Sequence, residues 1–97
     1  MNIVGIVVAM RIEARCITNR YLPLGEIINQ GDNSKICLCG IGESAARKAA
    51  IKLQKEGATS LISFGVSGAL DSKLRPGDLV LPRSIYNERL LPVSLAW

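Results

Sequence analysis

The sequence predicts an α/β fold built on a mainly parallel sheet. Residues 3–9 are almost continuously apolar and β-branched, which is typical of a strand buried on both faces. An alanine-rich helical pattern and another apolar strand follow later in the chain. Strands that alternate with helices in this way favour a parallel sheet. The length of 97 residues leaves room for one domain, which we expect to span residues 1–97.

The first half of the chain is expected to contain three strands. Residues 3–9 form the first strand, and residues 11–18 form a short helix. Residues 24–29 and residues 35–39 have the composition of two further strands. The segment "QGDNS" between them is rich in turn-forming residues, so it favours a hairpin.

The clearest element is a helix capped by Ser44 and ended by Gly57. Serine is a good N-cap, and glycine is common just beyond a helix C-terminus. Small side chains repeat along one face and predict close packing on the sheet; this face consists of Ala45, Ala46, Ala49, Ala50 and Leu53. Residues 60–64 form the next apolar strand.

The C-terminal part is expected to consist mostly of turns and loops. "GVSGALDSKL" is predicted to be a loop, and "RPGD" a turn with proline and glycine at its centre. Residues 79–81 are predicted to form a further short strand. The tail "YNERLLPVSLAW" has little pattern.

Composition argues against nucleic-acid-binding and membrane proteins. The 12 basic and 8 acidic residues give a net charge of +4, but the basic side chains are scattered and aromatic residues make up only 4%. Nucleic-acid surfaces usually cluster their cations and add stacking aromatics. No apolar run reaches the roughly 20 residues of a membrane span, and no basic leader precedes the first strand. We expect a cytoplasmic protein that does not bind nucleic acid and does not span a membrane.

Three cysteines and the lack of histidine restrict the available chemistry. Cys37 and Cys39 are two residues apart, and without histidine or a second cysteine pair they do not predict a zinc site. We expect free thiols in a reducing compartment, with no metal and no other cofactor. The commonest general base is also absent, so catalysis would use carboxylates, hydroxyls or backbone groups.

The glycines near residue 40 match the pattern of a dinucleotide-binding loop. "GIGESA", at residues 40–45, follows a predicted strand, as that pattern requires. Such a site also needs an acidic residue at the end of the next strand to bind the ribose hydroxyls. Here that strand ends "ISFG", and the next acidic residue is Asp71. The loop also follows a hairpin rather than the first strand, so the sequence disfavours a dinucleotide site.

Three loops are expected at the carboxyl edge of the sheet, where open α/β sheets bind their ligands. They are "AMRIEA", "CGIGES" and "FGVSGAL". The first loop places Glu13 in the first turn of a helix, where a carboxylate also simply complements the helix dipole. The other two supply glycines that allow close backbone approach, and each is equally explained as a tight turn.

The order and spacing of these segments resemble the purine nucleoside phosphorylase/uridine phosphorylase superfamily. The resemblance rests on Ala-Met-x-x-Glu, on Gly-Ile-Gly before the alanine-rich helix, and on "FGVSGAL" and "LRPGDLVLP". "AMRIEA" is most similar to methylthioadenosine/S-adenosylhomocysteine nucleosidases, and the general character of the sequence to hopanoid-associated phosphorylases. The resemblance implies the N-terminal part of a three-layer α/β/α sandwich with a mixed, mainly parallel sheet. It also implies cleavage of the N-glycosidic bond of a purine or related nucleoside.

The resemblance further implies roles for individual residues. Glu13 matches the glutamate that holds or deprotonates the attacking water. Ala9 and Met10 match residues that border the sugar pocket, and Ile41 matches one beside the ribose. The loop between the nucleophile and the base corresponds to Val66, Ser67 and Gly68.

Two departures from the family pattern leave two candidates for the nucleophile, water and phosphate. Many nucleosidases have serine at the position of Val66, whereas here the hydroxyl is on Ser67. Phosphorylases usually have an arginine just before this loop to bind phosphate, and "LISFG" has none. Arg11 and Arg15 flank Glu13 and are the candidates for a phosphate contact. Water and phosphate both remain candidate nucleophiles.

The chain is also much shorter than members of this family. By the resemblance, the residues that bind the ribose hydroxyls and protonate the departing base lie beyond residue 97 of the complete fold. We therefore expect a truncated N-terminal portion that is inactive or weakly active alone and forms homo-oligomers. The alternative is a catalytically silent α/β module that self-associates or binds nucleotide.

Overall fold

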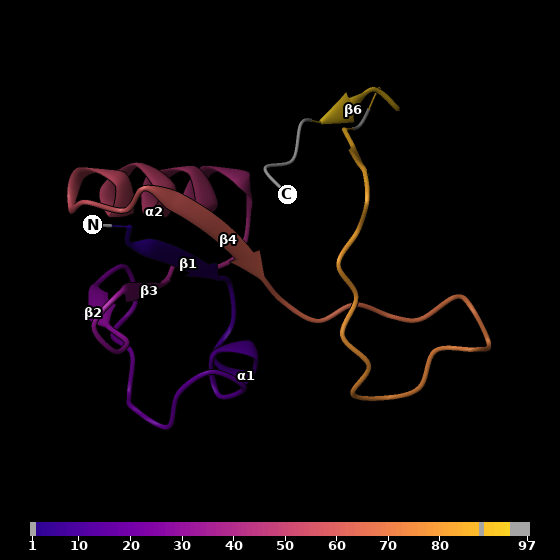
Figure 1. Ribbon diagram of the computed structural model, residues 1–97, viewed down its shortest axis with the longest axis horizontal. Coiled ribbons are helices and arrows are strands. Elements are labelled where there is room, and N and C mark those ends of the chain that lie inside the picture. Colours follow the sequence, from indigo (N-terminus) through magenta and orange to yellow (C-terminus); the bar gives the residue numbers. More distant parts are fainter. Residues whose placement is uncertain (1, 88, 94–97) are drawn as a thin grey trace. The chain divides into compact units, whose positions relative to one another are not determined.

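The computed structural model describes residues 2–87 and 89–93 of the chain. The chain divides into two compact units, Met1–Ser67 and Gly68–Trp97. The first unit contains a four-stranded sheet and two helices, and the second contains a short hairpin (Figure 1). A single domain over residues 1–97 stays a prediction.

The sheet of the first unit is mixed and mainly parallel, as predicted. Its strands are β1 (Val4–Val8), β2 (Ile27–Asn29), β3 (Ser34–Leu38) and β4 (Ser60–Phe64), in the order β2-β3-β1-β4. The central strand β1 pairs in parallel with both β3 and β4. Strand β2 pairs antiparallel with β3, which confirms the hairpin. Because β1 and β4 are parallel neighbours, the loops that follow them leave the same edge of the sheet.

Helices pack on both faces of this sheet and give it three layers. Helix α2 (Glu43–Lys55) lies on one face and α1 (Arg11–Ala14) on the other (Figure 1). Successive strand residues point to opposite faces, so each face has its own core. The core beneath α2 consists of Val7, Cys37, Ala49, Leu53 and Ala58. The core on the face of α1 consists of Val8, Ala14, Leu22, Ile36 and Leu38.

Helix α2 begins two residues earlier than its sequence signals predict. Its N-cap is Gly42, and Ser44 lies inside the first turn rather than capping it. The backbone of Gly42 has φ 110°, a conformation that glycine adopts without steric cost, so the turn before the helix ends there. The C-terminal signal is confirmed, because Gly57 follows the helix with φ 105°.

Helix α1 is shorter than the predicted span of residues 11–18. It ends at Ala14, and the amides of Cys16 and Ile17 bond three residues back, to the carbonyls of Glu13 and Ala14. These tighter bonds interrupt the α-helical pattern after Ala14. Strand β2 is likewise shorter than predicted and starts at Ile27, because Gly25 has φ 81° and belongs to a turn.

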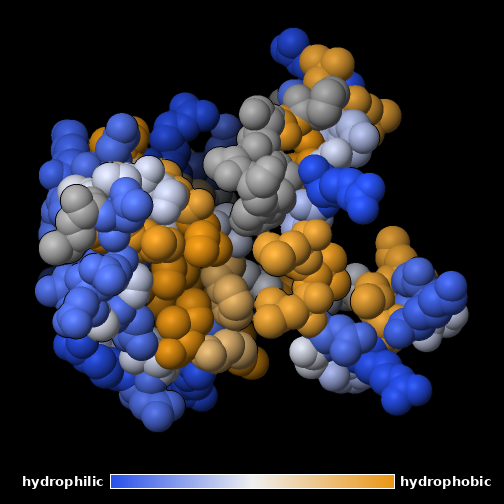
Figure 2. All heavy atoms as spheres, in the orientation of Figure 1, coloured by the Kyte–Doolittle hydropathy of each residue, from blue (hydrophilic) through white to orange (hydrophobic). Residues whose placement is uncertain are grey.

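Strand β4 forms one border of the sheet and exposes apolar side chains. Leu61 is 47% exposed and Ile62 is 41% exposed. Figure 2 shows apolar residues gathered over the part of the first unit where β4 lies. In the described part of the chain no strand pairs with the outer edge of β4. Unpaired apolar edges favour association, so this edge is compatible with the expected homo-oligomer, which stays a prediction.

The second unit contains a hairpin that its sequence does not reveal. Strand β5 (Ile85–Tyr86) pairs antiparallel with β6 (Pro92–Val93), inside the tail expected to lack pattern. The turn "RPGD" is confirmed, since the amide of Asp78 donates to the carbonyl of Arg75 at 3.0 Å. The strand predicted at residues 79–81 is wrong: these residues are exposed, and no described strand pairs with them.

None of the described helices is long and apolar enough to cross a lipid bilayer.

Replacing Leu53 with alanine should lower the free energy of unfolding by about 2–5 kcal/mol, because the substitution leaves a cavity in the core beneath α2. Ile51→Ala is the matched control on the same helix, since Ile51 is 46% exposed whereas Leu53 is 0% exposed. The control should change the free energy by no more than about 0.5 kcal/mol. Urea unfolding followed by circular dichroism measures both variants, and equal losses would contradict this packing.

Candidate active site

Glu13 is a buried carboxylate at the carboxyl edge of the sheet. It lies in α1, which starts directly after β1, and only 5% of its surface is exposed. Met10 is the N-cap of α1, and its amide donates to Glu13 Oε1 at 3.2 Å. This bond is one half of a capping box, in which the third helical residue reaches back to the N-cap. A hydrogen bond between residues three apart in sequence therefore orients one oxygen of the Glu13 carboxylate.

The second oxygen of Glu13 is bound by a distant part of the chain. The amide of Val66 donates to Glu13 Oε2 at 2.8 Å, across a sequence separation of 53 residues. Val66 follows β4 closely, and the parallel pairing of β4 with β1 brings this loop to α1. The carboxylate is thus held between two backbone amides from the two loops. Each oxygen retains capacity for another hydrogen bond, because a carboxylate oxygen accepts two.

Gly65 makes room for this carboxylate. A Cβ added at Gly65 would lie 2.6 Å from Glu13 Oε2, closer than such atoms approach each other. Sequence reasoning did not single out Gly65. Its signal is the glycine directly after the apolar strand, in "ISFGVSG".

A hollow of about 340 Å³ opens beside Glu13. This volume lies within the range of roughly 300–1,000 Å³ that is usual for small-molecule sites. Its lining residues come from β1 and the residue after it, from α1, from the loop before α2 and the first turns of α2, and from the end of β4; they are Val7, Ala9, Glu13, Cys39, Gly40, Gly42, Glu43, Ala46, Ser63, Phe64 and Gly65. The three loops predicted to meet at this edge therefore do contribute to one hollow. Within residues 2–87 and 89–93, no cluster of three or more acidic or cysteine side chains is placed to hold a metal ion.

The predicted site residues take different places around this hollow. Ala9 and Glu13 line it, and Met10 and Val66 contribute backbone amides to the Glu13 carboxylate. Ile41 lies between the lining residues Gly40 and Gly42, but its side chain is 80% exposed and is not part of the wall.

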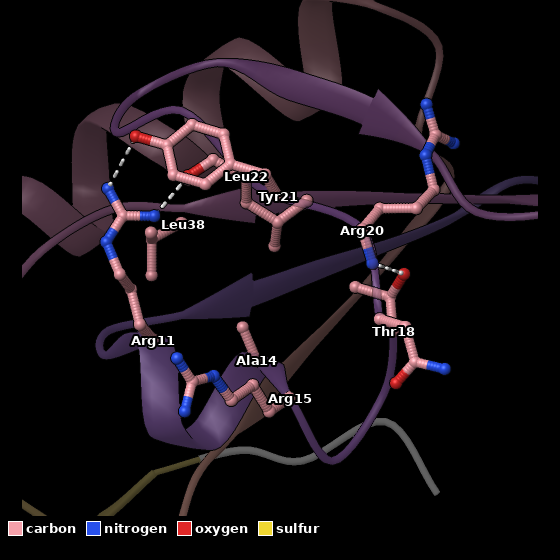
Figure 3. Close-up of a pocket in the computed structure, with 9 residues that line it drawn as sticks. Arg11, Ala14, Arg15, Thr18, Arg20, Tyr21, Leu22 and Leu38 are labelled. Atoms are coloured by element: carbon pink, nitrogen blue, oxygen red, sulfur yellow. Dashed lines mark hydrogen bonds between the residues drawn. The ribbon is translucent and has the colours of Figure 1, made fainter.

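The remaining predicted residues lie outside the lining. Ser67 is an exposed residue at the end of the first unit, and Gly68 belongs to the second unit. Arg11 and Arg15 line a different hollow of about 200 Å³ (Figure 3). The two hollows have no lining residue in common.

Cys39 and Glu43 are wall residues that sequence reasoning did not assign to the site. Burial raises the pKa of the Cys39 thiol, and the negative charge of Glu13 raises it further. Burial also raises the pKa of Cys37, with a further contribution from Cys39. The alternation of "CLC" in a strand indicates that both cysteines share a face, but nothing in the sequence tells which face borders the hollow.

Cys39 is expected to react slowly with iodoacetamide at neutral pH, because its raised pKa leaves little thiolate to act as the nucleophile. Its rate should increase as the pH rises through and beyond the ordinary thiol value of 9.0. Cys16, whose side chain is exposed, serves as the internal control and should react faster at neutral pH. Mass spectrometry of the two peptides gives both rates, and equal rates would contradict the burial of Cys39.

Gly65→Ala should displace the Glu13 carboxylate and lower the free energy of unfolding by about 1–3 kcal/mol, through the lost hydrogen bond from Val66. Gly68→Ala is the matched control, because no heavy atom lies within 4 Å of its added Cβ. Urea unfolding gives the free energies, and hydrogen exchange of the Val66 amide reports the bond directly. If both variants match the unmodified protein, Gly65 does not have this role.

One of three comparisons with known proteins gives a match, and this match agrees with the architecture. A sequence model of the phosphorylase superfamily matches residues 6–94. Neither the comparison with curated proteins nor the comparison with solved structures gives a match. The matched residues include both helices, most of the sheet and the three loops that form the Glu13 hollow. The chain therefore belongs to the phosphorylase superfamily.

Proposed function

We propose that the Glu13 hollow is the nucleophile side of a site that cleaves the N-glycosidic bond of a purine or related nucleoside. Membership of the phosphorylase superfamily supports nucleoside phosphorylase-type or nucleosidase-type chemistry. The observation that carries the proposal is the buried Glu13 carboxylate, which two amides hold on the wall of a hollow of small-molecule size.

The chemistry follows from the free acceptor capacity of Glu13. A water molecule in the hollow can donate a hydrogen bond to the carboxylate, which places Glu13 within the reach that a general base needs. As the bond between sugar and base breaks, positive charge develops on the sugar carbon. The water oxygen forms the new bond to that carbon, and Glu13 accepts the water proton. The bonding electrons leave with the base, which takes a proton from a group other than Glu13.

The predicted substrate contacts form part of the same proposal. Gly40, Gly42 and Gly65 carry no side chains into the hollow, so a sugar can approach the backbone there. We propose that the ribose and its surroundings contact Ala9, Met10, Ile41, Val66, Ser67 and Gly68.

The charge of the lining favours water over phosphate as the nucleophile. The wall carries two carboxylates, Glu13 and Glu43, and no lysine or arginine among the described residues. A phosphate ion there would lie near the Glu13 charge with no cation in the described lining to compensate it, since Arg47, which pairs with Glu43, is not part of the wall. Arg11 and Arg15, the candidates for a phosphate contact, line the other hollow. We infer that the reaction is hydrolysis.

Glu13→Gln should reduce release of free base by about 10²–10⁴-fold, because the amide is similar in shape but cannot accept the water proton. The substrates are methylthioadenosine, adenosine and inosine, each with and without phosphate, and chromatography measures the free base. Glu26→Gln is the matched control, since Glu26 is an exposed carboxylate outside both hollows. Hydrolysis predicts release that does not depend on phosphate.

Two results would contradict this proposal. Release that persists in the Glu13→Gln variant would exclude Glu13 as the base. No release from a folded sample with any substrate would favour the alternative, a catalytically silent α/β module that self-associates or binds nucleotide. Light scattering over a range of concentrations measures the self-association.

A further inference from the structure

A second hollow, of about 200 Å³, lies between α1 and the chain segment that leads to β2 (Figure 3). Its volume is below the roughly 300 Å³ at which sites for drug-sized ligands begin, so it suits a small ion or a single chemical group. The lining residues are Arg11, Ala14, Arg15, Thr18, Asn19, Arg20, Tyr21, Leu22 and Leu38. We call this the arginine hollow.

The arginine hollow has three positive charges and no negative one in its lining. Arg11, Arg15 and Arg20 contribute the charges, and no aspartate or glutamate of the described residues lines the hollow. The ion pair found among the described residues joins Arg47 to Glu43 and involves none of the three. Arg11 and Arg15 are also four residues apart, a spacing at which like charges on a helical turn repel each other.

Neutral groups hold Arg11 in place without compensating its charge. Its guanidinium donates to the Leu22 carbonyl at 2.7 Å and to the Tyr21 hydroxyl at 3.4 Å. It also lies over the Tyr21 ring, 4.7 Å from the centroid. Because these partners are uncharged, the cation is fixed in position but still attracts an anion.

The other two arginines differ in orientation. Figure 3 shows the Arg11 guanidinium turned toward Tyr21 and Leu22, the Arg15 guanidinium beside α1, and Arg20 pointing away from both. Arg20 donates to the carbonyl of Asn29 at 2.9 Å. Arg15 is exposed, and no described residue accepts a hydrogen bond from its guanidinium. One fixed cation and one cation without a described hydrogen-bond acceptor therefore line the same hollow.

We propose that the arginine hollow binds a phosphate group at a site separate from the Glu13 hollow. A phosphate monoanion or dianion matches the two charges of Arg11 and Arg15 better than a carboxylate does, because a phosphate group carries about −1.5 to −2 charges at neutral pH. Guanidinium groups also match the oxygen geometry of phosphate through paired N–H donors. The polar wall residues Thr18 and Asn19 add further hydrogen-bonding groups.

Helix α1 keeps the two sites apart. It presents Glu13 to one hollow and Arg11, Ala14 and Arg15 to the other. A phosphate in the arginine hollow is therefore not positioned to attack a sugar beside Glu13. This site acts as an accessory or regulatory anion site, and it does not depend on the proposed hydrolysis.

Arg15→Gln tests the proposal by removing the free cation. Isothermal titration with inorganic phosphate, at constant ionic strength in chloride, should show binding to the unmodified protein that weakens about tenfold or more in the variant, as expected for losing a charged hydrogen-bonding partner. The variant should fold normally because the Arg15 side chain is exposed, which circular dichroism checks. Lys48→Gln is the control, since it removes the same charge from an exposed position on α2.

Two further titrations test whether the site takes a free phosphate ion or a nucleotide phosphate, and whether Glu13 contributes to the binding. Adenosine monophosphate in place of inorganic phosphate shows whether the site takes a free ion or the phosphate group of a nucleotide. Glu13→Gln should leave phosphate binding unchanged, because Glu13 belongs to the other hollow. Absence of binding, equal weakening in Arg15→Gln and Lys48→Gln, or loss of binding in Glu13→Gln alone would each overturn the proposal.

Discussion

The hydrogen bond from the Val66 amide to the Glu13 carboxylate organises the candidate site. It joins the helix after β1 to the loop after β4, at a distance of 2.8 Å. A buried carboxylate without such partners would be strongly unfavourable, so the two loops must meet for Glu13 to be buried at all. The bond also explains Gly65, because any larger residue at that position would occupy the space of the carboxylate. One interaction therefore determines the position of a candidate base, the course of a loop and the identity of a neighbouring residue.

The short helix α1 separates two chemically opposite environments. On one side, the wall of the larger hollow carries Glu13 and Glu43, together with the thiol of Cys39. On the other side, three arginines line a smaller hollow to which no carboxylate of the described residues contributes. A turn of helix is enough for this separation, because residues two apart point to different sides whereas residues four apart point to the same side. This segregation of charge is the physical basis for treating hydrolysis and anion binding as separate properties of the chain.

The glycines around Ile41 have a different role from those of a dinucleotide-binding loop. Gly40 and Gly42 have φ values of 88° and 110°, and both line the hollow beside Glu13. Gly42 is also the N-cap of α2, and Glu43 follows in the first turn. A carboxylate in that turn already complements the positive end of the helix dipole and repels a pyrophosphate. The structure thus agrees with the sequence-based argument against a dinucleotide site.

The α/β class, the parallel sheet, the hairpin and the alanine-rich helix were all predictable from the amino-acid sequence, because they depend on local periodicity and turn chemistry. The sequence also identified Glu13 and the three loops at the sheet edge, through spacing that resembles a known superfamily. The three-dimensional structure was needed to find which groups touch Glu13 and that a Cβ at Gly65 would meet the carboxylate. It also decided that residues 79–81 form no strand while β5 and β6 pair. The contacts of Glu13 join segments far apart in the chain, and strand pairing depends on whether another strand lies alongside. Neither can be read from the residue pattern of a single segment.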